Sequence, residues 1–251
     1  MFAVELSGIS KSFLLTHGNT PCSGFISGSI QPKRINFWAL RDVDLKIKKG
    51  EHVGIVGSNG SGKTTLLKII AGISSQTYGS IITRGKIAAL IDLEAGFHPD
   101  LTGKENIFLN GMLMGMIRSE IKKRLEEIIE FADIGKFIYQ PFFTYSAGMK
   151  FRLAFAVAMA SDCEILLLDE LFVSGDINFQ RKSLLKLKAI QNSGKKITTI
   201  ICSHVPAFMW NFANRFYELK SGVLKPKPAK SMLTDIKREN KVWESIYKLV
   251  K

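Results

Sequence analysis

Alternating stretches and short apolar runs predict the strands of a sheet-based fold. Residues 4–9 and 43–47 alternate between apolar and polar side chains, a pattern that is typical of half-buried strands. Residues 53–56 and 165–168 contain only apolar residues and glycine, as do parallel strands that are covered on both faces. Further strands are predicted within residues 79–91, 196–201, 215–219 and 222–224. Strands of both kinds, with helical segments between them, indicate an α/β fold.

Helical periodicity predicts the elements between these strands. Residues 102–132 carry apolar side chains at helical spacing, with Thr102 or Ser119 as the N-cap. Residues 147–160 are almost wholly apolar in their second half, which predicts a buried helix. Because both segments lie between strand-rich parts, they predict a helical subdomain inserted at about residues 97–160. Other helices are predicted at residues 65–70, 179–190 and 232–250.

The least regular stretch is residues 14–37, which is rich in Gly, Ser, Pro and Thr. This composition predicts a long loop or a ragged hairpin. A connection of this length is either functional or mobile.

Length and composition set the class of protein. A chain of 251 residues fits one α/β domain, or one domain with an inserted subdomain, better than two equal domains. The sequence shows no secretory signal, and its charge-free apolar stretches are too short to span a membrane. The cysteines are odd in number and have no metal-ligand spacing, which suits a reducing cytosol. They are Cys22, Cys163 and Cys202.

Positive charge predicts an anionic partner. The formal net charge of +13 favours contact with nucleic acid or with the anionic inner leaflet of a membrane, and charge does not choose between them. The most basic part runs from Lys220 onward, with nine Lys or Arg residues against three acidic ones. Its predicted helix either packs on its own domain or contacts a membrane or a partner. The helix carries an apolar stripe of Trp243, Ile246, Tyr247 and Val250.

The most specific motif lies between a predicted buried strand and a predicted helix. It reads Gly57-Ser58-Asn59-Gly60-Ser61-Gly62-Lys63-Thr64, followed by Thr65. The glycines let backbone N–H groups crowd around phosphate oxygens, and the helix directs its partly positive N-terminus at the same place. Lys63 is expected to reach the β- and γ-phosphates, and the Thr64 hydroxyl to bind Mg²⁺. The alternative is an ordinary glycine turn, which the flanking strand and helix disfavour.

Two further strand ends carry candidates for chemistry. Asp169 and Glu170 follow an apolar strand, and ligands gather at the carboxyl ends of strands in parallel α/β sheets. Asp169 is expected to assist Mg²⁺ coordination, directly or through water, and Glu170 to orient and polarise the attacking water. His204 ends the next apolar strand, where it is placed to touch a γ-phosphate. The alternatives are a helix N-terminus for the acids and a structural role for the histidine.

A second anion site is predicted where Tyr145-Ser146-Ala147-Gly148-Met149 precedes the buried helix. This stretch supplies a hydroxyl, a glycine and a helix N-terminus. One chain does not need two such sites for one triphosphate. We therefore expect a dimer in which Ser146 and Gly148 of one copy cap the nucleotide held by the glycine loop of the other.

These motifs stand in the order found in ATP-binding cassette ATPases, which the chain strongly resembles from about residue 2 to 224. The resemblance implies a P-loop NTPase core with an antiparallel β subdomain and the helical insert in residues 1–225. A basic helical extension follows at 226–251. The resemblance also implies a head-to-tail homodimer. Two ATP molecules are then expected between the glycine loop of one copy and the signature motif of the other, which contains Ser146 and Gly148.

The same match assigns roles to single residues. Phe13 resembles the aromatic residue that stacks on adenine, and His204 resembles the switch histidine. Asp176 resembles the aspartate of the dimer-contact loop. The glutamine that the family places between the two subdomains is missing, and either Asp92 or Glu94 is its candidate replacement.

Departures from the common family pattern point to a subfamily. The signature reads Ser-Ala-Gly-Met where many members have Ser-Gly-Gly-Gln, and residues 173–176 read Val-Ser-Gly-Asp where Ser-Ala-Leu-Asp is common. With residues 96–107, these stretches are similar to ATPase subunits of bacterial polysaccharide exporters. The O-antigen branch matches best, and teichoic-acid and capsule exporters are relatives. Because the chain ends at 251 without the carbohydrate-binding domain of some O-antigen members, we expect no recognition of the glycan end by this subunit.

The function implied by the resemblance is mechanical. ATP binding closes two copies, hydrolysis releases them, and the helical insert passes the movement to a separate permease that translocates a lipid-linked polysaccharide. The subunit is expected to be peripheral, on the cytoplasmic face of the bacterial inner membrane. A soluble cassette that acts on nucleic acid is the competing hypothesis, and a single cassette without a long coiled coil disfavours it. A simple P-loop kinase or GTPase would leave the signature without a purpose.

Overall fold

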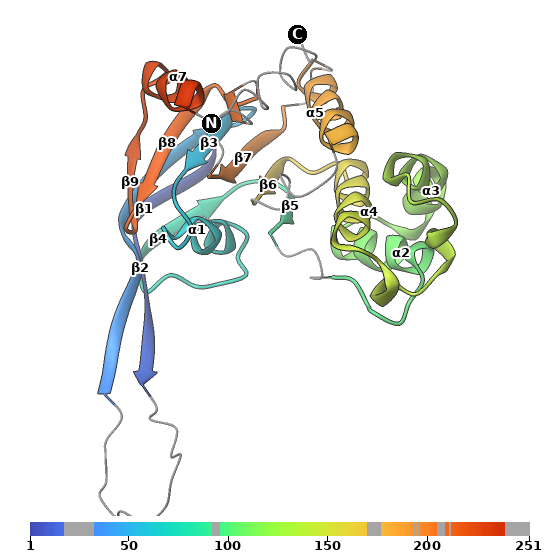
Figure 1. The fold of residues 1–251 in the computed structure, drawn as a ribbon, viewed down its shortest axis with the longest axis horizontal. Helices are drawn as coiled ribbons and strands as arrows, with labels where there is room; N and C mark the ends of the chain where they lie inside the picture. The colour runs from blue at the N-terminus through green and yellow to red at the C-terminus, as the bar shows by residue number, and fades with distance from the viewer. Residues whose placement is uncertain are drawn as a thin grey trace, which may run out of the picture.

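The computed structural model of the chain describes residues 1–17, 33–91, 96–169, 177–192, 194, 196–204, 209–210 and 212–238. Two sheets lie next to each other, and a group of helices lies to one side of them (Figure 1). The strands are β1 (Phe2–His17), β2 (Lys33–Lys48), β3 (His52–Val56), β4 (Tyr78–Thr83), β5 (Ile87–Leu90), β6 (Ile165–Leu168), β7 (Thr198–Ser203), β8 (Arg215–Lys220) and β9 (Val223–Pro226). The helices are α1 (Lys63–Ile70), α2 (Gly103–Leu113), α3 (Arg118–Ala132), α4 (Ala147–Ala160), α5 (Ile177–Asn192) and α7 (Ala229–Arg238), with 3₁₀ turns η1 (Gly135–Tyr139) and η2 (Phe142–Thr144).

The larger sheet has the strand order β5-β6-β7-β3-β8-β9 and is parallel except for the last pair. Its inner strand β6 is buried along its whole length. Ile165 and Leu167 belong to the core on one face of the sheet, and Leu166 and Leu168 belong to the core on the other. Because helices cover both faces, no position of this strand needs a polar side chain. The predicted buried strand is therefore confirmed.

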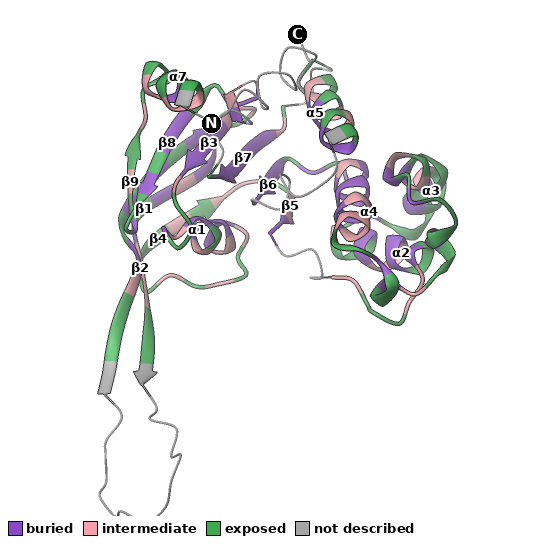
Figure 2. Cartoon of the chain, in the orientation of Figure 1, coloured by how far each residue is buried: buried purple, intermediate pink, exposed green. Residues whose placement is uncertain are grey.

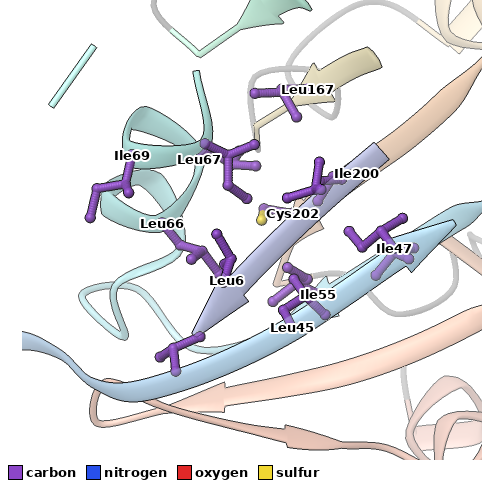
Figure 3. Close-up of a cluster of buried hydrophobic side chains, with 14 of the residues drawn as sticks. Leu6, Leu45, Ile47, Ile55, Leu66, Leu67, Ile69, Leu167, Ile200 and Cys202 are labelled. Carbon is purple, nitrogen blue, oxygen red and sulfur yellow. The ribbon is translucent and has the colours of Figure 1, made fainter. Parts of the chain in front are cut away.

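The smaller sheet has the order β2-β1-β4 and is antiparallel. Helix α1 packs between strands of the two sheets, so that Leu66 and Leu67 meet Leu6 of β1 and Ile55 of β3 in one apolar cluster (Figure 3). This core fixes the start of α1 against the end of β3, where the glycine loop lies. The two strands predicted within residues 79–91 are confirmed, and they join different sheets.

Helices α2, α3 and α4 share a core with η1 and η2. Helix α2 begins with a capping box: the Thr102 side chain accepts from the Glu105 N–H at 3.2 Å, and Glu105 Oε2 accepts from the Thr102 N–H at 2.8 Å. The prediction of Thr102 as an N-cap is confirmed. Ser119 is not an N-cap, because α3 begins one residue earlier, where Glu120 accepts from the Ile117 N–H at 2.9 Å.

Two lysines of α5 join that helix to α3. Lys182 Nζ donates to the carbonyl oxygens of Glu130 at 3.1 Å and Phe131 at 2.9 Å, in the last turn of α3. Lys186 Nζ donates to Glu127 Oε1 at 3.0 Å. The Lys182 ammonium also lies 4.8 Å from the centroid of the Phe131 ring. Cations are favourable at the C-terminal end of a helix, so the contacts stabilise this junction.

Strands β1 and β2 continue beyond the smaller sheet as a two-stranded hairpin, which projects from the body of the molecule (Figure 1). Of the two structures predicted for residues 14–37, the hairpin is therefore correct for residues 14–17 and 33–37. Residues 18–32 lie outside the described part of the chain.

Helix α7 lies against β8 by burying Met232. Lys227 strengthens the contact, because its Nζ lies 2.8 Å from Glu218 Oε1 and 2.8 Å from Asp235 Oδ2. The predicted stripe from Trp243 to Val250 lies outside the described residues. Among the helices that are described, none is long and apolar enough to cross a membrane.

Candidate functional site

The glycine loop is held between a strand of the larger sheet and a strand of the smaller one. A Cβ atom on Gly57 would lie 2.4 Å from the carbonyl oxygen of Leu219 in β8. Gly62 has a φ of 109°, and a Cβ there would lie 2.5 Å from the carbonyl oxygen of Ala39 in β2. Both positions therefore require glycine, because any side chain would displace a neighbouring backbone. The loop is fixed in place before any ligand arrives.

The centre of the loop contains a buried cation. Lys63 is 5% exposed, and its Nζ donates to the carbonyl oxygens of Gly57 at 2.7 Å and Ser58 at 2.9 Å. The buried Ser61 hydroxyl has no hydrogen-bond partner among the described residues. A buried hydroxyl without a partner is costly, and a phosphate oxygen at the loop would supply one. The loop is thus built to receive an anion.

The side chains of Thr64 and Asp169 meet at the carboxyl end of β6. The Thr64 hydroxyl donates to Asp169 Oδ2 at 2.6 Å, and the Asp169 backbone N–H donates to the Leu90 carbonyl at 3.2 Å. Asp169 is 6% exposed. A hydroxyl and a carboxylate are the oxygen ligands that Mg²⁺ takes beside substrate phosphates, so this pair fits that ion.

The carboxyl ends of β6, β7 and β3 lie next to one another. Strand β7 pairs with β6 on one side and with β3 on the other, and Ser203 lies opposite Val56. This register places the exposed His204 level with the first residue of the glycine loop. The strands that precede Asp169 and His204 are therefore neighbours in the sheet. Glu170, Asp176, Asp92 and Glu94 lie outside the described residues.

A cavity of about 380 Å³ opens beside the loop. The rings of Phe13 and Phe37 line it with Ala39, and the loop contributes the other walls. Phe13 and Phe37 are directly opposed in the β1–β2 pairing. Phe13 was predicted from the sequence and Phe37 was not, because the position opposite Phe13 is known only once the two strands are paired. The loop residues that line the cavity are Asn59, Gly60, Gly62, Lys63, Thr64 and Thr65.

Ser146 and Gly148 belong to a different cavity, of about 620 Å³, in the helical group. Ser146 is the N-cap of α4, and its Oγ accepts from the Met149 N–H at 3.2 Å. The preceding Tyr145 is buried and donates its hydroxyl to the Phe137 carbonyl at 2.6 Å. Burial raises the pKa of Tyr145 to about 12.

The two cavities share no lining residue. The start of helix α1 lines the first cavity, and the start of helix α4 lines the second. The two helices lie apart in the structure (Figure 1). One chain therefore does not bring its own Ser146 to its own glycine loop.

The sequence pattern that describes the ABC transporter family matches residues 40–173, just over half of the chain. The chain belongs to the ABC transporter family. This cassette is similar to the O-antigen export system ATP-binding protein RfbB of Klebsiella pneumoniae, with 38% identity over 208 residues that cover 80% of this chain and 83% of the relative. It is also similar to RfbB of Myxococcus xanthus, with 51% identity over 64% of this chain.

A third relative is the teichoic acids export ATP-binding protein TagH of Bacillus anthracis, with 43% identity over 75% of this chain. The cassette spans 37% of the Myxococcus protein and 34% of the Bacillus one. Among solved structures, it matches a dimeric ATP-binding cassette in a post-hydrolysis state bound to ADP and Pi. The TM-score is 0.73 and the identity 25%, over 90% of this chain and 98% of that one. The P-loop NTPase fold of an ABC cassette is thereby established.

Proposed function

We propose that this chain is the ATP-hydrolysing subunit of an exporter that drives a lipid-linked polysaccharide, foremost O-antigen, across the bacterial inner membrane through a separate permease. The observation that carries the chemistry is the convergence of Lys63, Thr64 and Asp169 at one end of the sheet. The cargo is inferred from the similarity to the two O-antigen export proteins.

Nucleotide binding changes the hydrogen-bond acceptors of the Lys63 ammonium. The ammonium leaves the carbonyl oxygens of Gly57 and Ser58 and pairs with the β- and γ-phosphates, while the Ser61 hydroxyl gains the partner it lacks. The base stacks on Phe13 at the open side of the same cavity. The backbone N–H groups of the loop and the N-terminus of α1 surround the phosphates.

Thr64 and Asp169 would hold Mg²⁺, which neutralises charge on the phosphates when it is bound with ATP. Glu170 follows Asp169 directly in the chain and orients the attacking water. His204 reaches toward the γ-phosphate from the end of β7.

A second copy completes the site. Ser146 and Gly148 line a separate cavity, and a head-to-tail pair would place that cavity of one copy over the glycine loop of the other. ATP then binds the closed pair better than the open one, which is the condition for coupling binding to movement. In this proposal residues 1–225 form the cassette with its helical insert at 97–160, and 226–251 form a basic extension. The subunit is peripheral, on the cytoplasmic face of the membrane beside its permease.

Two variants test the proposal. Lys63→Ala should weaken ATP binding at least roughly 10-fold, since charge-assisted hydrogen bonds are lost, whereas Lys68→Ala on the same helix should leave binding unchanged. Glu170→Gln should bind ATP, lose nearly all turnover and accumulate as a dimer in Mg-ATP, measured by analytical ultracentrifugation. A Glu170→Gln protein that stays monomeric when saturated, or that hydrolyses ATP at the wild-type rate, contradicts the proposal.

The similarity to TagH favours teichoic-acid export as the second candidate function. Complementation of strains that lack the ATPase of an O-antigen exporter or of a teichoic-acid exporter separates the two cargoes. A salt-sensitive shift of DNA or RNA without permease co-purification would instead support the nucleic-acid hypothesis.

A further inference from the structure

The hairpin formed by β1 and β2 carries an apolar stripe on one face. Phe13 lies opposite Phe37, and Leu15 lies opposite Ile35. Residues two apart on a strand share a face, so these two cross-strand pairs are contiguous. We call this set the hairpin stripe. Its side chains are between 41% and 47% exposed.

The nucleotide cavity accounts for only half of the hairpin stripe. Phe13 and Phe37 line that cavity, whereas Leu15 and Ile35 lie farther out along the hairpin and do not. This part of the hairpin stands clear of the body and is exposed (Figure 2). A two-stranded ribbon is marginally stable on its own, and contiguous exposed apolar side chains mark a contact surface. Leu15 and Ile35 therefore form a surface that is suited to contact with another apolar surface.

The second cavity has an apolar wall that the hairpin stripe could contact. Ile134, Phe137 and Met149 form its apolar lining beside Ser146, and Phe137 is 49% exposed whereas Ile134 is 6% exposed. Asp133, Lys136 and Arg152 line other parts of the cavity. Within one chain the hairpin extends away from the sheets toward the bottom of the view, whereas the helical group lies to the right, so the stripe does not reach this cavity (Figure 1). In the proposed dimer, Ser146 of one copy caps the nucleotide that Phe13 of the other copy contacts. The two apolar surfaces then border the same nucleotide from opposite copies.

We propose that the hairpin stripe of one copy packs against the cavity formed by Ile134, Phe137 and Met149 of a second copy. The inference rests on the proposed nucleotide-sandwiched dimer and adds a contact to it. Phe13 and Phe37 serve the nucleotide, while Leu15 and Ile35 serve the partner copy. Leu15 and Ile35 thus adjust the affinity of the closed dimer without changing the nucleotide affinity of a single copy.

The test uses Glu170→Gln protein, in which ATP is not consumed. Leu15→Ser combined with Ile35→Ser should leave ATP affinity of the monomer and the melting temperature unchanged. The dimer dissociation constant in Mg-ATP should rise on the order of 100-fold, because four buried aliphatic side chains are lost per symmetric dimer. Leu14→Ser is the matched control, since Leu14 is 57% exposed on the same strand but pairs with Asn36 on the opposite face.

The partner surface is tested separately. Phe137→Ser should weaken dimerisation in the same way, whereas Phe143→Ser, at a more exposed ring outside the cavity, should not. Combining Phe137→Ser with the two hairpin substitutions should add little further loss.

The outcomes distinguish this inference from the function it rests on. If the Glu170→Gln parent dimerises and the hairpin variant dimerises equally well, the inference is overturned while the proposed function stands, and a permease or lipid surface is the occupant. If the parent itself does not dimerise, both are overturned.

Discussion

Gly57→Ala is expected to destabilise the cassette through a single steric contact. The new methyl group would lie 2.4 Å from the backbone oxygen of Leu219 and 2.6 Å from Ser61 Oγ, about 1 Å closer than ordinary contacts. The serine can rotate, but Leu219 lies in the core and its backbone is held in β8. Overpacking costs about 1–3 kcal/mol, and the rigid backbone contact places this case near the upper end.

The assay is chemical and thermal unfolding without nucleotide. A loss of about 3 kcal/mol corresponds to a fall in melting temperature of roughly 6–12 °C for a chain of this size. Gly148→Ala provides the contrast, because its Cβ would lie 3.9 Å from the nearest neighbouring atom, Ser146 Oγ, and an alanine favours helix α4. This second variant should be as stable as the wild type or more stable.

The reasoning is refuted if Gly57→Ala unfolds within about 0.5 kcal/mol of the wild type, the range of a surface substitution without special contacts. ATP affinity supplies an independent check. It should fall in Gly57→Ala, since the loop must shift, but not in the isolated monomer of Gly148→Ala.

Two further predictions concern aromatic residues. Phe37→Ala should weaken ATP and GTP binding alike, by roughly 5- to 100-fold as for the loss of a base-stacking ring, while Phe143→Ala should change neither affinity in a fluorescence titration. Equal nucleotide affinity in the wild type and in Phe37→Ala would show that this ring does not contact the base. Tyr145 has a pKa raised by burial to about 12, so the unfolded chain loses this proton first as the pH rises above about 10. The stability difference between wild type and Tyr145→Phe should therefore be constant below about pH 9 and fall from pH 10 to 12 in urea unfolding, and a flat difference would contradict the assignment.

The elements that are predicted well from the sequence are those whose pattern is formed by residues close together along the chain. Strand β6 and helix α4 are apolar on nearly every side, and the glycine loop between β3 and α1 has a spacing that few other structures share. Thr102 was one of two residues predicted as an N-cap, and its partner Glu105 lies only three residues away. Such signals depend on neighbours along the chain, so they are legible before folding.

The features that escaped prediction depend on pairing between distant segments. Phe37 joins Phe13 only through the β1–β2 register, across a connection whose composition predicts a loop as well as a hairpin. Ser119 resembles a cap in sequence, but the carboxylate of Glu120 decides the start of the helix. Gly57 was expected to serve phosphate binding, whereas the structure adds the proximity of Leu219, which no local pattern reveals.

The junction that Lys182 and Lys186 make between α5 and α3 couples the two helices. Its hydrogen bonds sit at the tips of two flexible four-carbon chains, Lys182 and Lys186. Beside them, the ring of Phe131 in α3 lies edge-on to the ring of Phe179 in α5, with the centroids 5.7 Å apart. A displacement of α5 is therefore expected to carry α3 with it, through the lysine hydrogen bonds and this ring contact together.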